Sequence, residues 1–171
     1  MKIILVGYMG SGKSVVAANL SIAMQIPFVE LDILIEQRAN SSIKTIFSEK
    51  GELFFRKLEH QIFNELIATK GNLIISTGGG TPCYFNNHDA LQGADTRSFY
   101  LSASITTLAD RLLKGKQNRP LLAKFNPSET KDFIAKHLFE RSYFYHQAQY
   151  TIDVNTKSVP QVVAAIVACL A

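Results

Sequence analysis

The sequence predicts an α/β fold in which a parallel sheet is covered by helices on both faces. Short apolar runs, of the length of buried strands, alternate along the chain with segments of helical periodicity. The stretch from Gly7 to Ser14 follows the first apolar run directly, precedes the first helical pattern, and has the spacing G-x-x-x-x-G-K-[ST]. Strand, glycine-rich loop and helix in this order predict a P-loop three-layer sandwich. The length suits a single domain, which we expect to span residues 1–171.

The glycine-rich stretch has the residue types that bind phosphate. Glycines allow backbone N–H groups to turn inward around phosphate oxygens, and the following helix adds its positive dipole end. Lys13 is expected to reach the terminal phosphates and the Ser14 hydroxyl to ligate Mg²⁺. A bland glycine-rich turn is the alternative, but the flanking strand and helix favour nucleoside triphosphate binding. The expected nucleotide-binding residues here are Gly10, Ser11, Gly12, Lys13, Ser14 and Val15.

Composition and charge exclude several classes of protein. The net charge of +4 is spread along the chain, without the basic stripe of a nucleic-acid surface. No apolar run approaches the ~20 residues that span a bilayer. Cys83 and Cys169 are far apart and lack metal-ligand spacing, which favours reduced, unpaired thiols. Since Met1 leads almost directly into the first strand, we expect no removable targeting segment and a cytoplasmic location.

The first half of the chain begins with two strands and two helices. The apolar run 3–6 predicts the first strand, and the helix that follows runs over 15–25. Pro27 enforces an extended backbone, so 28–31 is expected to be the second strand. It is followed by a short helix over 33–39.

Punctuating residues mark the next elements. Ser42 is a candidate cap for a helix that Gly51 closes, and Glu52 begins a long amphipathic helix that Gly71 stops. The apolar run 73–75 then predicts a third buried strand.

The second half continues the alternation. The expected elements are a short helix over 86–91, a strand over 98–101, a helix over 105–114 capped by Ser104, a helix from 128 to 145, a strand over 150–154, and a last helix from 158 with Pro160 in its first turn. Residues 115–127 break the pattern and form a loop long enough to be a lid.

Two carboxylates end the second predicted strand. Glu30 and Asp32 are two residues apart, which in a strand places them on one face, at the sheet edge where ligands of parallel sheets collect. The alternative is that Asp32 only caps the helix over 33–39.

Two further features could serve an anionic ligand. Arg56 shares a helix side with apolar residues, so either its stem snorkels over the core edge or its guanidinium is held for an anion. Gly78, Gly79 and Gly80 follow the third strand, and three glycines in a plain flexible turn would be costly in entropy. We therefore expect a ligand to approach this main chain closely.

The chain resembles the shikimate kinase family over essentially its whole length. The resemblance is carried by the P-loop, by Asp32 with the Glu-Gln-Arg that follows, by Gly51-Glu52 with Phe55-Arg56, by the triple glycine, by Arg119-Pro120-Leu121-Leu122, and by Glu140-Arg141 with Tyr145. It implies a five-stranded parallel sheet of order 2-3-1-4-5. It also implies a cytoplasmic monomer that transfers the γ-phosphoryl of ATP to the 3-hydroxyl of shikimate in chorismate biosynthesis.

The resemblance also implies individual roles. Asp32 would contact the ring hydroxyls, Arg56 and Arg141 would grip the shikimate carboxylate, and the triple glycine with Gly79 at its centre would supply backbone to the substrate. Arg119 would be the lid arginine on the ATP phosphates, Arg111 would flank adenine, and Glu30 would hold Mg²⁺ through water beside Ser14. The substrate-binding helices would lie at about 32–70, and the adenine contacts near 155–157 stay open.

Two positions depart from the family pattern. The family usually has Asp-x-Asp where this chain has Glu30-Leu31-Asp32, and a proline two residues after the arginine that Arg141 matches, where this chain has Tyr143.

Two other functions compete with this interpretation. One is a different small-metabolite kinase of the same fold, such as a gluconate kinase, which the two arginines and the triple glycine disfavour. The other is a nucleotide-gated binding module without a small substrate, but the chain has no Asn-Lys-x-Asp stretch for reading guanine.

Overall fold

A parallel sheet of five strands forms the centre of the part of the chain that the computed structural model describes, residues 1–115 and 124–171. The strand order is β2-β3-β1-β4-β5, and every neighbouring pair is parallel. This confirms the predicted fold class and strand order. The strands are β1 (Lys2–Val6), β2 (Phe28–Glu30), β3 (Leu73–Ser76), β4 (Thr96–Ser102) and β5 (Tyr150–Asp153).

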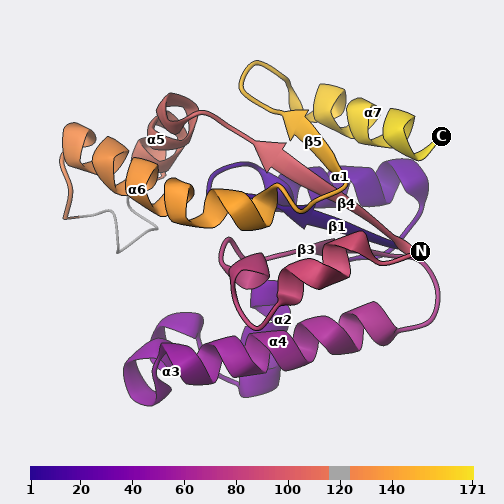
Figure 1. Cartoon of the computed structure of the whole chain (residues 1–171), viewed down its shortest axis with the longest axis horizontal. Helices are drawn as coiled ribbons and strands as arrows, with labels where there is room; N and C mark the ends of the chain where they lie inside the picture. Colours follow the sequence, from indigo (N-terminus) through magenta and orange to yellow (C-terminus); the bar gives the residue numbers. More distant parts are fainter. Residues whose placement is uncertain (116–123) are drawn as a thin grey trace.

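Helices cover both faces of the sheet (Figure 1). Helices α1 and α7 pack side by side, α5 packs on α6, and α4 packs on both α2 and α3. Their bounds are α1 (Lys13–Met24), α2 (Leu31–Ala39), α3 (Ile43–Lys50), α4 (Glu52–Ala68), α5 (Ile105–Lys114), α6 (Pro127–Tyr145) and α7 (Val159–Leu170), with short 3₁₀ turns η1 (Thr81–Cys83) and η2 (Asn87–Gln92). None of the helices in these residues is long and apolar enough to cross a membrane.

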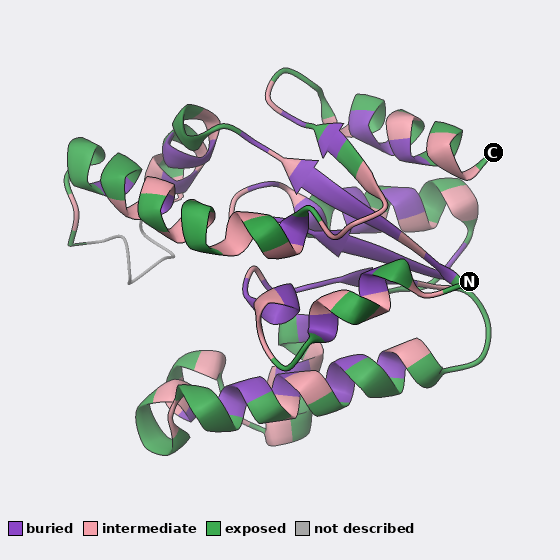
Figure 2. Ribbon diagram, viewed as in Figure 1, coloured by how far each residue is buried: buried purple, intermediate pink, exposed green. Residues whose placement is uncertain are grey.

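The core lies on both sides of the central strand β1. Every residue of β1 is buried, and Figure 2 shows the middle strands as mostly buried. Ile4 pairs in register with Ile75 of β3 on one side and Ser98 of β4 on the other. A strand covered by helices on both faces has no solvent side, which explains why the run reads as uninterrupted apolar residues. This rigid centre fixes where the glycine-rich loop leaves the sheet.

Helix α2 begins earlier than the sequence pattern predicted. Leu31 is already helical, and the N-cap position belongs to Glu30, whose backbone is extended. The expectation that Glu30 and Asp32 share one face of a strand was therefore wrong, and so was the alternative that Asp32 is the cap. Leu31 and Ile35, one helical turn apart, are both fully buried, and this tertiary packing decides the boundary.

Helix α6 also begins one residue before its expected start. Asn126 caps it, accepting from the Glu129 backbone N–H at 2.8 Å, while the Glu129 carboxylate accepts from the Asn126 N–H at 2.9 Å. Pro127 occupies the first helical position, where a missing N–H costs nothing. The expected lid at 115–127 thus loses its last residue to the helix, and its residues 116–123, including Arg119, lie outside the described part of the chain.

Candidate active site

The candidate site lies at the carboxyl ends of β1, β2 and β3. A cavity of about 370 Å³ opens there between the glycine-rich loop, the start of α2 and the triple glycine after β3. Its lining includes Lys13, Ser14, Asp32, Gly78 and Gly79. Parallel strands bring these segments to one edge although they are far apart in sequence.

The glycine-rich loop has the backbone of a phosphate cradle. Gly10 and Gly12 have φ values of +84° and +97°, which side-chain-bearing residues rarely adopt, and α1 begins directly afterwards at Lys13. The Lys13 ammonium donates to the carbonyl oxygens of Gly7 at 2.7 Å and Tyr8 at 3.1 Å. The positive end of α1 and the ammonium therefore meet at one point of the cavity wall.

The Ser14 hydroxyl donates to Glu30 Oε2 at 2.8 Å. The last residue of β2 thus meets the first turn of α1 beside the cavity. Both oxygens are hard ligands of the kind that Mg²⁺ prefers.

Asp32 lies on the first turn of α2 and faces Gly78. A Cβ on Gly78 would be 2.7 Å from Asp32 Oδ1, so only glycine admits the carboxylate there. The residue is exposed at the mouth of the cavity, but the surrounding protein displaces enough water to raise the pKa of its carboxyl group. The charges of Lys13 and Arg56 oppose this and lower the pKa.

Arg56 is not a snorkelling residue. Only 7% of Arg56 is exposed to solvent. Its Nη1 donates to Glu59 Oε2 at 2.9 Å, and its Nε lies 3.5 Å from Glu52 Oε1. The guanidinium also lies over the Tyr84 ring, 4.2 Å from the centroid. Burial alone would lower the pKa of Arg56, but the charge and hydrogen bond of Glu59, together with Tyr84 and Glu52, more than offset it and the pKa is raised. The cation is held in a fixed place beside the cavity rather than at the core edge.

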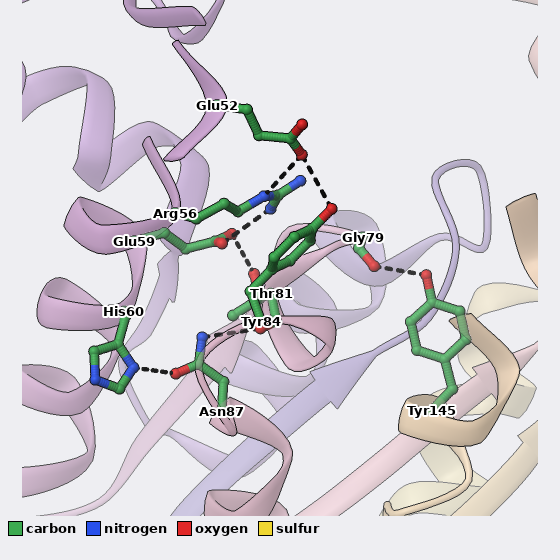
Figure 3. A network of polar contacts seen from close by, with 9 residues as sticks. All are labelled: Glu52, Arg56, Glu59, His60, Gly79, Thr81, Tyr84, Asn87 and Tyr145. Carbon is green, nitrogen blue, oxygen red and sulfur yellow. Dashed lines mark hydrogen bonds and ion pairs between the residues drawn. The ribbon is translucent and has the colours of Figure 1, made fainter. Parts of the chain in front are cut away.

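Glu59 is a site residue that the sequence reasoning missed. It is fully buried, and its other oxygen, Oε1, accepts from the Thr81 hydroxyl at 2.7 Å (Figure 3). Burial raises the pKa of Glu59, while Arg56 and Thr81 lower it. An acid three residues after Arg56 on an amphipathic helix was the available signal. Glu59 ties α4 to the turn after the triple glycine.

The three glycines each admit a different charged side chain. Besides Asp32 at Gly78, a Cβ on Gly79 would lie 3.1 Å from Arg141 Nη1, and one on Gly80 would lie 2.6 Å from Arg56 Nη2. None of the three has a positive φ, so close approach and not backbone conformation requires glycine here. Protein side chains thus approach this main chain closely, and the expected approach of a ligand stays a prediction. One carboxylate and two guanidinium groups converge on a single loop.

Tyr145 anchors the same loop. Its buried hydroxyl donates to the Gly79 carbonyl at 2.6 Å, as Figure 3 shows. Burial raises the pKa of Tyr145 well above its ordinary value, so the phenol remains a donor. Arg141 lies one helical turn before Tyr145 on α6, and both therefore reach Gly79 from the same helix face.

Arg111 lies on the other side of the glycine-rich loop. Its Nη1 donates to the carbonyls of Gly10 at 3.1 Å and Ser11 at 3.3 Å, and its Nη2 donates to the Val154 carbonyl at 3.1 Å. A second cavity of about 210 Å³ lies beside it, and Gly12, Val15 and Lys157 also line that cavity. Arg111 thus joins the glycine-rich loop to the residue that follows β5, beside this second cavity.

The fold and this geometry define a P-loop protein whose phosphate cradle shares a cavity with Asp32 and the triple-glycine loop, where Arg56 and Arg141 also converge. The family model described as shikimate kinase matches residues 9–171. The chain belongs to the shikimate kinase family.

Individual relatives agree with this assignment. A shikimate kinase of Flavobacterium johnsoniae is 54% identical over 170 residues, which is 99% of both chains. The crystal structure of a shikimate kinase from Bacteroides thetaiotaomicron has a TM-score of 0.89 at 33% identity and covers 99% of this chain and 96% of that one. A shikimate kinase from Acinetobacter baumannii, solved in complex with shikimate, has a TM-score of 0.87 at 31% identity and covers 99% and 92%. The membership decides against the gluconate kinase and the nucleotide-gated module.

Proposed function

We propose that this chain transfers the γ-phosphoryl group of ATP to the 3-hydroxyl of shikimate, giving shikimate 3-phosphate and ADP. One observation carries the proposal: Asp32, Arg56 and Arg141 all lie close to the triple-glycine loop, and Asp32, Gly78 and Gly79 of this group line the cavity next to the phosphate loop. A cyclic polyol acid needs cations for its carboxylate and an acceptor for the reacting hydroxyl. The family membership and the shikimate complex of the A. baumannii relative support the same substrate.

The two arginines suit a carboxylate for different reasons. Arg56 is pre-positioned by Glu59 and Tyr84, so little side-chain freedom is lost when it binds an anion. Arg141 reaches the same loop from a different helix, α6, and approaches Gly79 whereas Arg56 approaches Gly80. A carboxylate between them would accept charge-assisted hydrogen bonds from two directions, which orients the ring as well as binding it.

Asp32 would orient the reacting hydroxyl. It lies beside Lys13, whose charge acts on its carboxylate, so hydroxyl and terminal phosphate would be held next to each other. Phosphoryl transfer depends mainly on such positioning and on charge stabilisation. Lys13, with Arg119 by resemblance, would supply the positive charge.

The residues around Ser14 fit a Mg²⁺ ion. Its hydroxyl and the Glu30 carboxylate are adjacent hard oxygens, and Mg²⁺ bound with ATP takes few protein ligands and keeps several waters. Bound there, Mg²⁺ would neutralise charge on the phosphates. Ser14 would ligate it directly and Glu30 through water.

The remaining assignments complete the proposal. The chain would act as one domain over residues 1–171, with substrate-binding helices at about 32–70 and a lid at about 115–127. It would work as a cytoplasmic monomer, with neither nucleic acid nor membrane as a partner, and the second cavity, beside Arg111, would receive the adenine.

Coupled ADP release tests the proposal. Shikimate, quinate and gluconate are compared side by side with ATP and Mg²⁺, and shikimate alone should stimulate release strongly. Lys13→Ala should lower kcat by orders of magnitude with the fold intact, whereas Lys131→Ala, at an exposed lysine of α6, should not. Equal ADP release with and without shikimate would contradict the assignment.

A further inference from the structure

Tyr8 connects the phosphate loop to helix α6. Its main chain belongs to the loop, where its carbonyl accepts from the Lys13 ammonium at 3.1 Å and from the Ser11 N–H at 3.1 Å. Its side chain is only 1% exposed, and the hydroxyl lies 2.9 Å from Nδ1 of His137 on α6. The two rings also meet edge to face, with centroids 5.4 Å apart. One residue thus has its backbone in the nucleotide cradle and its side chain against another element.

His137 belongs to a stripe of α6 that also carries Arg141. Phe133, His137, Arg141 and Tyr145 are spaced four residues apart, so they lie along one face of the helix. Phe133 packs on His137 with ring centroids 5.3 Å apart, and the Arg141 guanidinium lies 5.9 Å from the Tyr8 ring centroid. Tyr8 therefore contacts two consecutive members of the stripe that ends on the triple-glycine loop.

The Tyr8–His137 hydrogen bond joins two groups that burial keeps uncharged. Burial raises the pKa of Tyr8 to about 12, so the phenol keeps its proton. Burial, followed by the charge of Arg141, lowers the pKa of His137, which favours a neutral ring. The other charged groups that act on His137 are Glu140, Arg56 and Glu52. A neutral His137 adds no positive charge beside Arg141.

Lys13 supplies a reason for the contact to respond to nucleotide. A lysine ammonium has only three N–H donors, and Lys13 uses its ammonium to bond the Gly7 and Tyr8 carbonyls. Hydrogen bonds to several phosphate oxygens would therefore compete with these two bonds. Loosening the bond to the Tyr8 carbonyl alters the hold on the residue whose side chain contacts His137. A contact can couple two sites only if it differs between their states, and this one is placed to do so.

We propose that Tyr8 and His137 are positioning residues that couple the phosphate loop to Arg141, so that nucleotide binding and the grip on the acceptor's carboxylate strengthen each other. The inference rests on the proposed function, in which Arg141 binds the shikimate carboxylate. Neither residue touches the reacting atoms. Their effect is on how strongly one substrate favours the other.

Isothermal titration of the full chain with shikimate tests the coupling. The dissociation constant is measured without nucleotide and with saturating Mg²⁺ and AMP-PNP, an ATP analogue that is not hydrolysed. In the wild type we expect tighter shikimate binding with the analogue, and the ratio of the two constants measures the coupling. Tyr8→Phe and His137→Phe both keep a ring and remove the hydrogen bond, and each should lower this ratio at least about twofold toward one. The double variant should match the single ones, since they remove the same contact.

Tyr143→Phe is the matched control, because Tyr143 is an exposed tyrosine of the same helix, and its ratio should equal that of the wild type. If Tyr8→Phe does not fold, as judged by its melting temperature, the ratio of His137→Phe tests the coupling, because His137 is less buried than Tyr8.

A ratio of one in the wild type would overturn the coupling. So would variants that weaken shikimate binding equally with and without the analogue, since that is the result of a merely structural contact. Shikimate turnover with unchanged ratios would refute only this inference, whereas absence of shikimate-dependent turnover would refute the proposed function.

Discussion

Replacing Gly80 by alanine should weaken shikimate binding while leaving the fold intact. The backbone of Gly80, with φ −94° and ψ −10°, is open to alanine, so the substitution acts only through its new methyl group. That methyl would lie 2.6 Å from Arg56 Nη2, whereas ordinary van der Waals contact begins at 3.4 Å. The guanidinium must therefore retreat by about 0.8 Å, and a misplacement of about 1 Å costs on the order of 10²-fold in rate. We expect kcat/KM for shikimate to fall by about 10- to 100-fold.

Steady-state kinetics with each substrate varied in turn checks this expectation. The KM for ATP should change little, because Gly80 does not line the cavity at the phosphate loop. Gly71→Ala is the control: its positive φ of +85° strains an alanine, but nothing lies within 4 Å of the new methyl group. It should lower the melting temperature without altering the shikimate kinetics. Wild-type kcat and KM for shikimate in Gly80→Ala would refute the steric reasoning and the assignment of Arg56.

Three other predictions concern the charged groups of the site. Arg56→Lys should raise the KM for shikimate, because an ammonium cannot make the planar two-point contact of a guanidinium, and unchanged kcat and KM would show that Arg56 does not grip the carboxylate. Glu30→Asp should alter the Mg²⁺ requirement only modestly, since a water shell absorbs a change in reach, whereas Asp32→Glu should cripple kcat at saturating Mg²⁺; Mg²⁺ titrations that find Glu30→Asp the more damaging would reverse the two roles. The pKa of Asp32 is raised, so its carboxylate takes up a proton at higher pH than an ordinary aspartate, and kcat/KM should decline with falling pH above the usual aspartate range. A pH profile without such an acid limb would argue against an ionised Asp32 in the reaction.

Local signals in the sequence were sufficient to predict where α3 and α5 begin. Ser42 and Ser104 cap their helices as predicted, each accepting a backbone N–H at 3.1 Å from the residue three positions on. Capping depends on a side chain and a backbone group that are neighbours in sequence, so it can be recognised without the tertiary structure. The boundary at Leu31 could not, because burial against the core overrides the strand pattern there.

Contacts between segments that are far apart in the chain could not be predicted from the sequence. Glu59 is a site residue only because the turn after β3 brings Thr81 to α4, and Tyr8 is 129 residues away from His137. Arg111 was expected beside adenine by resemblance, but its bonds to the glycine-rich loop depend on how α5 packs. The triple glycine could be recognised as a place of close approach. Which side chains approach it follows only from the fold.

Helix α6 is continuous through Tyr143, one of the two positions at which the sequence departs from the family pattern. Tyr143 keeps its backbone N–H, and the helix runs unbroken from Pro127 to Tyr145. The rise between Arg141 and Tyr145 is therefore that of one regular turn, about 6 Å along the axis. The Arg141 guanidinium, which lies close to Gly79, and the Tyr145 phenol, which donates to its carbonyl, therefore have no proline between them at which the helix could bend. Because α6 moves as one unit here, a tilt of the helix that brings Arg141 toward the acceptor also moves Tyr145 and the Gly79 carbonyl to which Tyr145 donates.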